Sequence, residues 1–359
     1  MRTLPLLILG AGQVGRTLVS QLLDSAEIHA RRDGVRFSIR GWSDKDRELV
    51  HPDELSLQTL RSALALWTRE APLSGVVGVA PSRGPKALVS ELGAPGSILV
   101  DVTASPDTGD ALWAAISSGM GAAIANKVPL VGDQRLFDAL VASGRFRYES
   151  TVGSAVPVIE AVWALNRCVD EVSMVQGVLS GTLGFLCTSL EEGKSFSSVV
   201  RDAMDRGYTE PDPRIDLGGM DVARKALILA RSLGWKVSLD QVKVESLFPP
   251  EMAALSLADF LTRMTGLDDG MAARVRDARA GGHALRYVAQ IKAGQIDVGL
   301  LAVPRDTAIG RLRGNDNLIA FHSRYYPTEP LILQGRGAGV DAAAAGVHAD
   351  IVALAKTMA

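Results

Sequence analysis

Residues 4–23 read LPLLILGAGQVGRTLVSQLL and determine the architecture of the N-terminal part of the chain. Residues 4–9 form a short, continuous apolar run, which is typical of a parallel strand buried on both faces. The motif Gly10-Ala11-Gly12-Gln13-Val14-Gly15 follows directly, and residues 16–23 then show helical periodicity. A glycine motif between a strand and a helix predicts the first turn of a dinucleotide-binding unit.

Each glycine of this motif has its own physical role. Gly10 allows the tight turn, Gly12 lets the backbone approach a pyrophosphate, and Gly15 lets the helix pack closely on the strand. The alternative interpretation is a glycine-rich turn that binds no ligand. The position of the motif, directly after an apolar run, favours the dinucleotide.

The second expected strand, residues 37–42, leads to residues of both charges that bear on the choice of dinucleotide. Asp44 would bond a ribose hydroxyl, which favours NAD. Arg40, Lys45 and Arg47 are close enough in sequence to accept a 2′-phosphate, which favours NADP. The sequence leaves this choice open, and each of these charges is also explained as a solvated loop residue.

Three further apolar runs, residues 75–80, 98–102 and 122–125, are expected to be strands of the same sheet. Helical patterns alternate with them, so the sequence predicts an α/β fold with a Rossmann-type doubly wound parallel sheet. Thr103 and Lys127 follow two of these strands at their carboxyl ends, where ligands of open α/β sheets bind. Lys127 is therefore a candidate for charge stabilisation or proton transfer, although a lone lysine is more often solvated.

The character of the chain changes near Tyr148, where a small, polar and turn-rich stretch begins. We expect residues 1–148 with 335–359 to form the dinucleotide-binding domain. Residues 149–334 are expected to form an α+β domain for substrate binding, catalysis and dimerisation. A hairpin around residues 292–294 could build a sheet that two subunits share.

The composition excludes several classes of function. The chain has 38 Lys and Arg against 40 Asp and Glu, a net charge of −2, so no basicity invites nucleic acid or an anionic membrane. No stretch reaches the roughly 20 apolar residues that span a bilayer. Cys168 and Cys187 lack metal-ligand spacing, which fits a reducing, cytoplasmic compartment.

A second segment, residues 203–225, reads AMDRGYTEPDPRIDLGGMDVARK and concentrates charge ahead of an apolar helix. Glu210, Asp216 and Asp221 precede Lys225, with prolines and glycines between them. Burying such charges is costly unless they meet one another or a ligand. The segment is therefore predicted to be a substrate site.

The spacing of Asp221 and Lys225 places them one turn apart on one face, if a helix starts near Gly219. The simplest interpretation is a surface ion pair worth a few tenths of a kcal/mol. Lys225 shares its face with Ile228 and Leu229, however, and so should point toward packed interior. A partly desolvated lysine beside carboxylates suits proton exchange with an alcohol or carbonyl.

The same segment resembles the signature segment of homoserine dehydrogenases. The matching positions are Ala203, Gly207-Tyr208-Thr209, Asp212-Pro213, Asp216-Leu217, Gly219, Asp221 and Lys225. The likeness extends to residues 125–129 (ANKVP), residues 149–153 (ESTVG) and the glycine loop 334–339. It implies a short, monofunctional form without a regulatory domain.

The resemblance implies a function for the whole chain. Those enzymes reversibly reduce L-aspartate 4-semialdehyde to L-homoserine with NADPH or NADH, in threonine and methionine biosynthesis. A homodimer that acts on a small molecule is expected, with no nucleic-acid or membrane partner. The alternatives are an oxidoreductase of the same fold acting on another small amino or hydroxy acid, and a dinucleotide sensor without chemistry.

The resemblance also implies roles for single residues. Lys225 is expected as the acid/base lysine, and Lys127 as a second catalytic lysine beside the nicotinamide. Glu210 and Asp216 are expected to hold the amino acid, together with Asp221, which would also orient Lys225. The motif and the resemblance together place the following residues at the cofactor: Gly10, Gly12, Gln13, Val14, Gly15, Asp44, Thr103, Lys127, Gly207 and Gly339.

Two further expectations concern the substrate and a metal ion. Thr182 is expected near the substrate, in a segment where homoserine dehydrogenases usually read GxxNGTxN. Here Ser180 and Gly184 replace both asparagines, which bears on substrate identity more than on reaction class. A sodium ion is implied, with ligands from Glu149, Val152, Ser154 and Val156.

Overall fold

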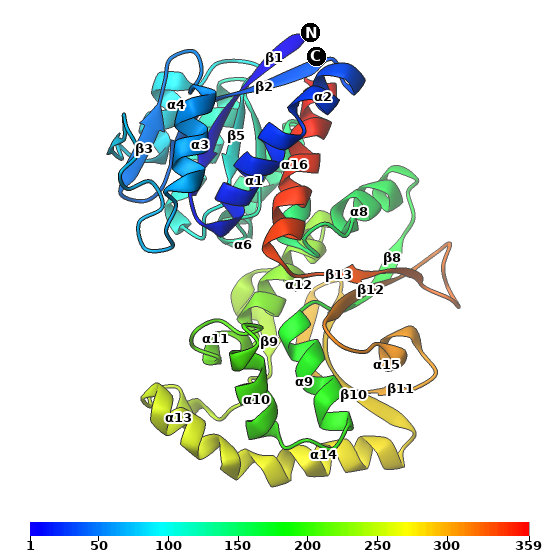
Figure 1. The fold of residues 1–359 in the computed structure, drawn as a ribbon. Coiled ribbons are helices and arrows are strands. Elements are labelled where there is room, and N and C mark those ends of the chain that lie inside the picture. The colour runs from blue at the N-terminus through cyan, green and yellow to red at the C-terminus, as the bar shows by residue number, and fades with distance from the viewer. Residues whose placement is uncertain (359) are drawn as a thin grey trace. The chain divides into compact units, whose positions relative to one another are not determined.

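The computed structural model describes residues 1–358, which form two compact units (Figure 1). Unit 1 joins Met1–Ala155 to the C-terminal segment that starts at Gly339, and unit 2 is Val156–Ala338. The predicted boundaries lay at 148/149 and 334/335. Unit 1 extends to Ala155 because the turn η2 (Glu149–Thr151) packs on the C-terminal helix, where the backbone N–H of Glu149 donates to Asp350 Oδ2 at 2.8 Å.

Unit 1 contains a seven-stranded sheet in the order β4-β3-β2-β1-β5-β6-β7. Strand β1 pairs in parallel with β2 and β5, and β5, β6 and β7 continue in parallel. This order confirms the Rossmann-type α/β prediction. The strands are β1 (Arg2–Leu9), β2 (Val35–Ser43), β3 (Arg47–Val50), β4 (Ala80–Pro81), β5 (Ile98–Asp101), β6 (Gly121–Ile124) and β7 (Phe146–Arg147).

One edge of this sheet departs from the prediction of a parallel sheet. Strand β3 pairs antiparallel with β2, and β4 pairs antiparallel with β3. The predicted strand over residues 75–80 is wrong, since only Ala80 and Pro81 pair. Gly75 (φ 75°) and Gly78 (φ 87°) adopt left-handed backbone conformations that interrupt extended structure, so this stretch forms turns.

Helices cover the sheet of unit 1 on both faces. Helices α1, α3 and α16 bury Leu18, Leu60 and Val347 against one face, and α4 packs Leu88 on the other, close to Gly41. In Figure 1, α16 (red) runs alongside α1 (blue). The helices are α1 (Gln13–Asp24), α2 (Ala26–Arg32), α3 (Leu57–Ala65), α4 (Pro85–Leu92), η1 (Pro106–Thr108), α5 (Gly109–Ser117), α6 (Val128–Val131), α7 (Gln134–Ala142), η2 (Glu149–Thr151) and α16 (Val340–Thr357).

Unit 2 contains a six-stranded mixed sheet in the order β13-β12-β8-β10-β11-β9. The predicted hairpin is confirmed, since β10 and β11 pair antiparallel along their whole length around the turn at residues 293–294. The strands are β8 (Val172–Val178), β9 (Val242–Val244), β10 (His283–Lys292), β11 (Gln295–Pro304), β12 (Asp316–Ser323) and β13 (Leu331–Arg336).

Helices α9, α12 and α14 pack on strand β10, as does the short helix α15, which contributes Ile309 to a separate core cluster with Val178 and Leu318. This arrangement makes unit 2 an α+β fold. Its helices are α8 (Val158–Arg167), α9 (Gly181–Glu191), α10 (Phe196–Asp205), α11 (Arg214–Leu217), α12 (Met220–Ser232), η3 (Leu239–Gln241), η4 (Pro250–Met252), α13 (Leu257–Arg263), η5 (Met264–Leu267), α14 (Asp268–Ala280) and α15 (Ala308–Arg311).

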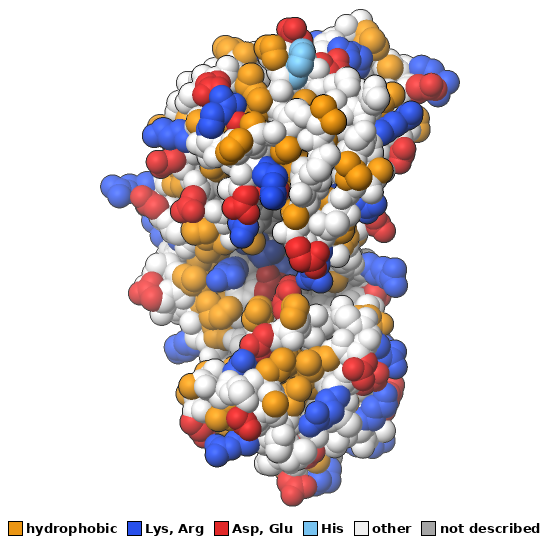
Figure 2. Space-filling view, turned by 60° about the vertical axis from the view of Figure 1, so that its left-hand side comes forward, with side chains coloured by type: hydrophobic (Ala, Val, Ile, Leu, Met, Phe, Trp, Pro, Cys, Tyr) orange, Lys and Arg blue, Asp and Glu red, His pale blue; other side chains and the backbone are white. Residues whose placement is uncertain are grey.

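The helices and one face of the surface bear on the predicted absence of membrane and nucleic-acid partners. Within residues 1–358, every helix is too short or too polar to cross a bilayer. Figure 2 shows Lys and Arg interspersed with Asp and Glu over the face that it draws, which matches the net charge of −2.

A partly buried chain of titratable side chains joins helices α2 and α16 in unit 1. His29 Nδ1 lies 2.8 Å from Asp33 Oδ2, and His29 Nε2 lies 2.8 Å from His348 Nε2. Burial, followed by the charges of His29 and Arg32, lowers the pKa of His348 from 6.5 to about 4. The folded chain therefore disfavours protonation of this histidine relative to the unfolded chain.

The free energy of unfolding should consequently fall as the pH drops from about 6.5 to about 4, because the unfolded chain binds the extra proton first. His348→Gln, which cannot take up that proton, should flatten this part of the profile in chemical denaturation. His51→Gln is the matched control, since His51 is exposed and accepts only backbone N–H groups. Identical profiles for both variants would contradict the assignment.

Candidate active site

The glycine motif of unit 1 has the geometry of a phosphate-binding turn. Gly10 has φ 108°, a left-handed conformation that favours glycine. A Cβ at Gly15 would lie 1.9 Å from the carbonyl oxygen of Gly10. Only glycine therefore allows the helix to pack this closely on the turn. A Cβ at Gly12 would meet no atom within 4 Å, which leaves open space beside this backbone.

Helix α1 starts at this turn without a side-chain cap. Gly12 is its N-cap residue, and Gln13 and Val14 form the first turn, whose N–H groups can bind an anion. Trp67 Nε1 donates to the carbonyl of Ala11 at 2.7 Å, and the guanidinium of Arg16 lies 5.3 Å from the Trp67 ring centroid. Trp67 lies in a loop after α3, and no local pattern in the sequence indicates that it supports the glycine turn.

Asp44 lies directly beyond β2, beside the glycine turn. The preceding residue, Ser43, accepts a hydrogen bond from Gly10 N at 2.7 Å. Asp44 Oδ1 accepts from the backbone N–H groups of Asp46 (2.8 Å) and Arg47 (2.6 Å). Asp44 Oδ2 is buried and accepts no hydrogen bond from residues 1–358. Asp44 thus follows the second strand of the sheet, the position at which dinucleotide-binding folds carry the acidic residue that bonds the adenosine ribose.

The three cations considered for a 2′-phosphate differ in their surroundings. Arg40 Nε donates to the carbonyl of Asp53 at 3.0 Å, which directs it toward another loop. Lys45 Nζ is exposed and lies 3.8 Å from Asp46 Oδ2. Arg47 is half-buried, next to the bond that its backbone makes with Asp44.

A buried polar network fixes the carboxyl ends of β5 and β6. Asp101 Oδ1 accepts from Thr103 N (3.0 Å) and Thr103 Oγ1 (2.7 Å), and Asn126 Nδ2 donates to Asp101 Oδ2 at 3.0 Å. Asn126 Oδ1 accepts from Val128 N at 3.0 Å. Lys127 lies between Asn126 and Val128 and is the N-cap residue of α6, so this network fixes the position of its backbone.

Lys225 on helix α12 is held by two oxygens in unit 2. Its Nζ donates to the carbonyl of Leu179 and lies 2.8 Å from Asp221 Oδ2, one turn earlier on the helix. The Lys225 side chain is only 12% exposed, against 45% for Asp221, so the lysine points inward as its helical spacing predicted. This pair is therefore not a solvated surface ion pair.

Three other predicted residues gather near this pair. Asp216 Oδ2 accepts from Glu210 N at 2.8 Å, and Thr182 Oγ1 donates to the carbonyl of Tyr208 at 2.5 Å. Burial, followed by the charges of Glu210 and Asp221, raises the pKa of Asp216 above its usual range. The charges of this cluster, three carboxylates and one ammonium, complement a cationic group.

The remaining predicted residues are placed as follows. Gly207 (φ 67°) terminates α10, and Gly339 (φ 124°) is the N-cap of α16. Glu149 is buried, as is Val152, and Ser154 has φ 58°. Val156 begins unit 2. Residues 1–358 contain no cluster of three His, Cys, Asp or Glu side chains that could hold a metal.

Ser180 and Gly184, the two departures from the expected motif, have different structural roles. Ser180 caps helix α9, with Oγ accepting from Leu183 N at 3.2 Å. A Cβ at Gly184 would lie 3.1 Å from the carbonyl oxygen of Gly314, and Thr188 Oγ1 accepts from Gly314 N at 3.1 Å. The loop before β12 thus packs closely against α9 at Gly184, which leaves little room for an asparagine.

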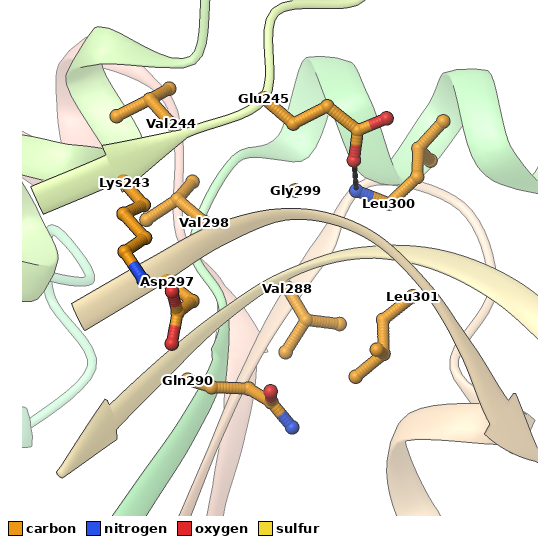
Figure 3. A pocket seen from close by; sticks show the side chains of 10 residues that line it. All are labelled: Lys243, Val244, Glu245, Val288, Gln290, Asp297, Val298, Gly299, Leu300 and Leu301. Atoms are coloured by element: carbon orange, nitrogen blue, oxygen red, sulfur yellow. Dashed lines mark hydrogen bonds between the residues drawn. The ribbon is translucent and has the colours of Figure 1, made fainter. Parts of the chain in front are cut away.

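A separate hollow of about 390 Å³ lies on the sheet of unit 2 (Figure 3). Glu245 Oε2 accepts from Leu300 N at 2.9 Å at its rim, and Val288 and Leu301 contribute apolar surface. None of the predicted site residues lines it. We assign no chemistry to this hollow.

The site combines predicted groups with some that sequence reasoning missed. The backbone carbonyls of Leu179 and Tyr208 carry no signal in a sequence, because any residue supplies a carbonyl. Asp101 and Asn126 do carry a signal, since both are polar residues at strand ends, but their hydrogen bonds to each other depend on the pairing of the two strands.

The glycine turn, the sheet order and the lysine–carboxylate cluster define an α/β protein with a Rossmann-type unit and a separate unit bearing acid/base groups. A family model described as homoserine dehydrogenase matches residues 157–352. Homoserine dehydrogenase of Emericella nidulans is 41% identical over 278 residues, which cover 72% of this chain and 76% of that protein. The chain belongs to the homoserine dehydrogenase family.

Two other similarities extend over almost the whole chain. The bifunctional aspartokinase/homoserine dehydrogenase of Haemophilus influenzae is 32% identical over 357 residues, 98% of this chain but only 43% of that protein. This chain thus spans less than half the length of the bifunctional relative. A mutant homoserine dehydrogenase from a hyperthermophilic archaeon, solved with NADPH, has a TM-score of 0.78 at 22% identity, covering 99% and 98% of the two chains. That likeness shows the shared fold.

The packing at helix α9 predicts that asparagine is tolerated at position 180 but destabilises the protein at position 184. Gly184→Asn should lower the free energy of unfolding by about 1–3 kcal/mol, because its side chain is forced against the Gly314 carbonyl. Ser180→Asn should change it by less than about 0.5 kcal/mol, since asparagine caps helices as well as serine does. Urea denaturation of both variants checks this. Equal losses would contradict the packing argument.

Proposed function

We propose that this chain is a homoserine dehydrogenase that reversibly reduces L-aspartate 4-semialdehyde to L-homoserine with NADPH or NADH. This reaction belongs to threonine and methionine biosynthesis. The observation that carries the proposal is the position of Lys225, which points inward and is held by Asp221 and the carbonyl of Leu179. The chain that carries this lysine belongs to the homoserine dehydrogenase family. Unit 1 would bind the dinucleotide and unit 2 the amino acid.

Lys225 would exchange a proton with the substrate oxygen. Reduction adds one hydride to the aldehyde carbon and one proton to its oxygen. An ammonium has three N–H donors, and Leu179 O and Asp221 Oδ2 accept two of them. The third can reach a substrate oxygen and deliver the proton, and in the reverse direction the neutral amine removes it. Lys127 would stabilise the developing negative charge.

The carboxylates near Lys225 would hold the substrate. The amino acid carries an ammonium that needs anionic or carbonyl partners once it leaves water. Glu210 and Asp216 would pair with it, and Asp221 would share this task while it orients Lys225. Thr182, fixed by its bond to the carbonyl of Tyr208, would line the same site.

The glycine turn of unit 1 fits a dinucleotide. The open space at Gly12 and the uncapped start of α1 leave room and donors for a pyrophosphate. Thr103 and Lys127, set by the Asp101 network, would stand at the carboxyl edge of the sheet, with Gly207 and Gly339 as further cofactor contacts. When bound, the dinucleotide supplies or accepts the hydride. The NADPH complex of the archaeal relative supports this assignment.

A sodium ion is proposed at residues 149–156, where the chain passes from unit 1 into unit 2. The proposed donors are the Glu149 carboxylate and the carbonyls of Val152, Ser154 and Val156, an all-oxygen set that suits a hard cation. Gly153 (φ 84°) and Ser154 (φ 58°) turn the backbone sharply here, and Glu149 is buried.

A cytoplasmic homodimer is the proposed state of the protein. Cys168 and Cys187 are both free thiols, which fits a reducing compartment. The long hairpin β10–β11 gives unit 2 a sheet large enough to be shared between two copies.

Lys225→Ala should lower kcat for NAD(P)-dependent oxidation of L-homoserine by about 10²- to 10⁴-fold, because general acid–base catalysis is lost. Lys236→Ala, at an exposed lysine just beyond the same helix, is the control and should keep wild-type rates. Absorbance of the reduced nicotinamide gives both values. Wild-type kcat in a folded Lys225→Ala protein would rule out the role of this lysine.

Asp44 should favour NAD over NADP, because its carboxylate, with Oδ2 unpaired among the described residues, would bond a ribose hydroxyl and repel a 2′-phosphate. Asp44→Ser should raise the ratio of kcat/KM for NADP to that for NAD by about tenfold, the equivalent of about 1.4 kcal/mol. Asp53→Ser, at an exposed aspartate after β3, serves as the control. A ratio that stays constant or falls would show that Asp44 does not read the ribose.

A further inference from the structure

Asn317 on strand β12 is a fully buried polar side chain that no described group satisfies. The residue is 0% exposed, and neither Nδ2 nor Oδ1 hydrogen-bonds any part of residues 1–358. Buried amides in folded proteins almost always have partners, because an unpaired one forfeits its hydrogen bonds to water. Such a group therefore needs an explanation in function or in a change of structure.

Packing alone does not explain an amide at this position. Asn317 pairs with Gly335 in the β12–β13 ladder, so its backbone is in regular structure. Its side chain lies against Gly337, where an added Cβ would come within 1.8 Å of Nδ2. The amide thus contacts the Cα of a glycine, and a leucine of similar size would fill the space without leaving polar atoms unpaired.

The register of the sheet places Asn317 on the face that carries α12. Ile319, two residues further along β12, pairs with Gly177, and Gly177 pairs with Ala289 of β10, so these side chains share one face. Tyr287 is on that face too, since it lies two residues from Ala289. A Cβ at Gly219, the N-cap of α12, would lie 2.0 Å from Tyr287 Oη.

Asn317 is also adjacent to the group that holds Lys225. Leu318 pairs with Val178 at the end of β8, so Asn317 and Leu179 are the next residues on the two strands. The carbonyl of Leu179 accepts the hydrogen bond from Lys225 Nζ. The unpaired amide is therefore a neighbour of the proposed acid/base lysine within unit 2.

We propose that Asn317 is a substrate-binding residue whose amide binds the α-carboxylate of the amino acid through Nδ2. This rests on the proposed function. The carboxylates of Glu210, Asp216 and Asp221 suit the substrate ammonium but repel its carboxylate. A neutral amide donates to that carboxylate at a smaller desolvation cost than a second cation. Gly337 packs against the amide in this structure, so the proposal requires this glycine to move when the substrate carboxylate reaches Nδ2.

Asn317→Leu in the full chain tests the proposal. KM for L-homoserine should rise about 10- to 100-fold, the effect of losing a hydrogen bond to a charged group. KM for the dinucleotide should stay at the wild-type value, and Tm without ligands should be unchanged or higher, because an unpaired buried amide is removed. A group with a purely structural role would instead lower Tm and leave KM unchanged.

Asn317→Asp adds a charge test in a side chain of the same shape. It should raise KM for L-homoserine more than Asn317→Leu does, because an aspartate repels the substrate carboxylate. If Asn317→Leu fails to fold, Asn317→Asp and the smaller Asn317→Ser provide the same comparison. Asn166→Leu is the structural control: its amide donates to Ser232 O at 2.9 Å, so this variant should lower Tm without changing KM.

Three results would overturn the assignment. They are an unchanged KM for L-homoserine in all Asn317 variants, an effect confined to KM for the dinucleotide, and a lower KM in Asn317→Asp. Wild-type protein without activity on L-homoserine would instead refute the proposed function itself. An active wild type with unaffected Asn317 variants would refute only this inference.

Discussion

The placement of one ammonium organises unit 2. Lys225 Nζ is held by the carbonyl of Leu179, at the end of β8, and by Asp221, one helical turn earlier on α12. The contact with Leu179 requires α12 to lie close against the sheet. The close packing of α12 on the sheet depends on Gly219, which has a left-handed backbone and starts the helix. Because glycine has no Cβ, the hydroxyl of Tyr287 can lie against this residue. Tyr287 in turn donates to the carbonyl of Glu245 at 2.7 Å.

The charges around that ammonium are not balanced within the protein. Asp221 contacts the lysine directly, and burial, together with the charges of Glu210 and Asp221, raises the pKa of Asp216 nearby. Asn317, on the same face of the sheet, adds an amide with unused hydrogen-bonding capacity. Such groups lower the stability of the folded chain, which is consistent with the proposal that they bind substrate.

Local patterns made much of this fold predictable. The strand–glycine–helix start, the β10–β11 hairpin and the helix that carries Lys225 all follow from periodicity and turn residues. Contacts that depend on which strands pair could not be predicted from these local patterns. The antiparallel edge strands, the support of the glycine turn by Trp67 and the buried amide of Asn317 depend on which strands pair. No local pattern encodes those pairings.

The return of the chain to unit 1 constrains how the protein folds during synthesis. Helix α16 follows unit 2 in the chain, yet it supplies Val347, Ile351 and Leu354 to the core of unit 1. The nucleotide fold therefore cannot close until the ribosome has made the whole of unit 2. Unit 2 is a continuous segment with its own core and can fold first. Until α16 is made, the first unit exposes an apolar face that chaperones would need to shield.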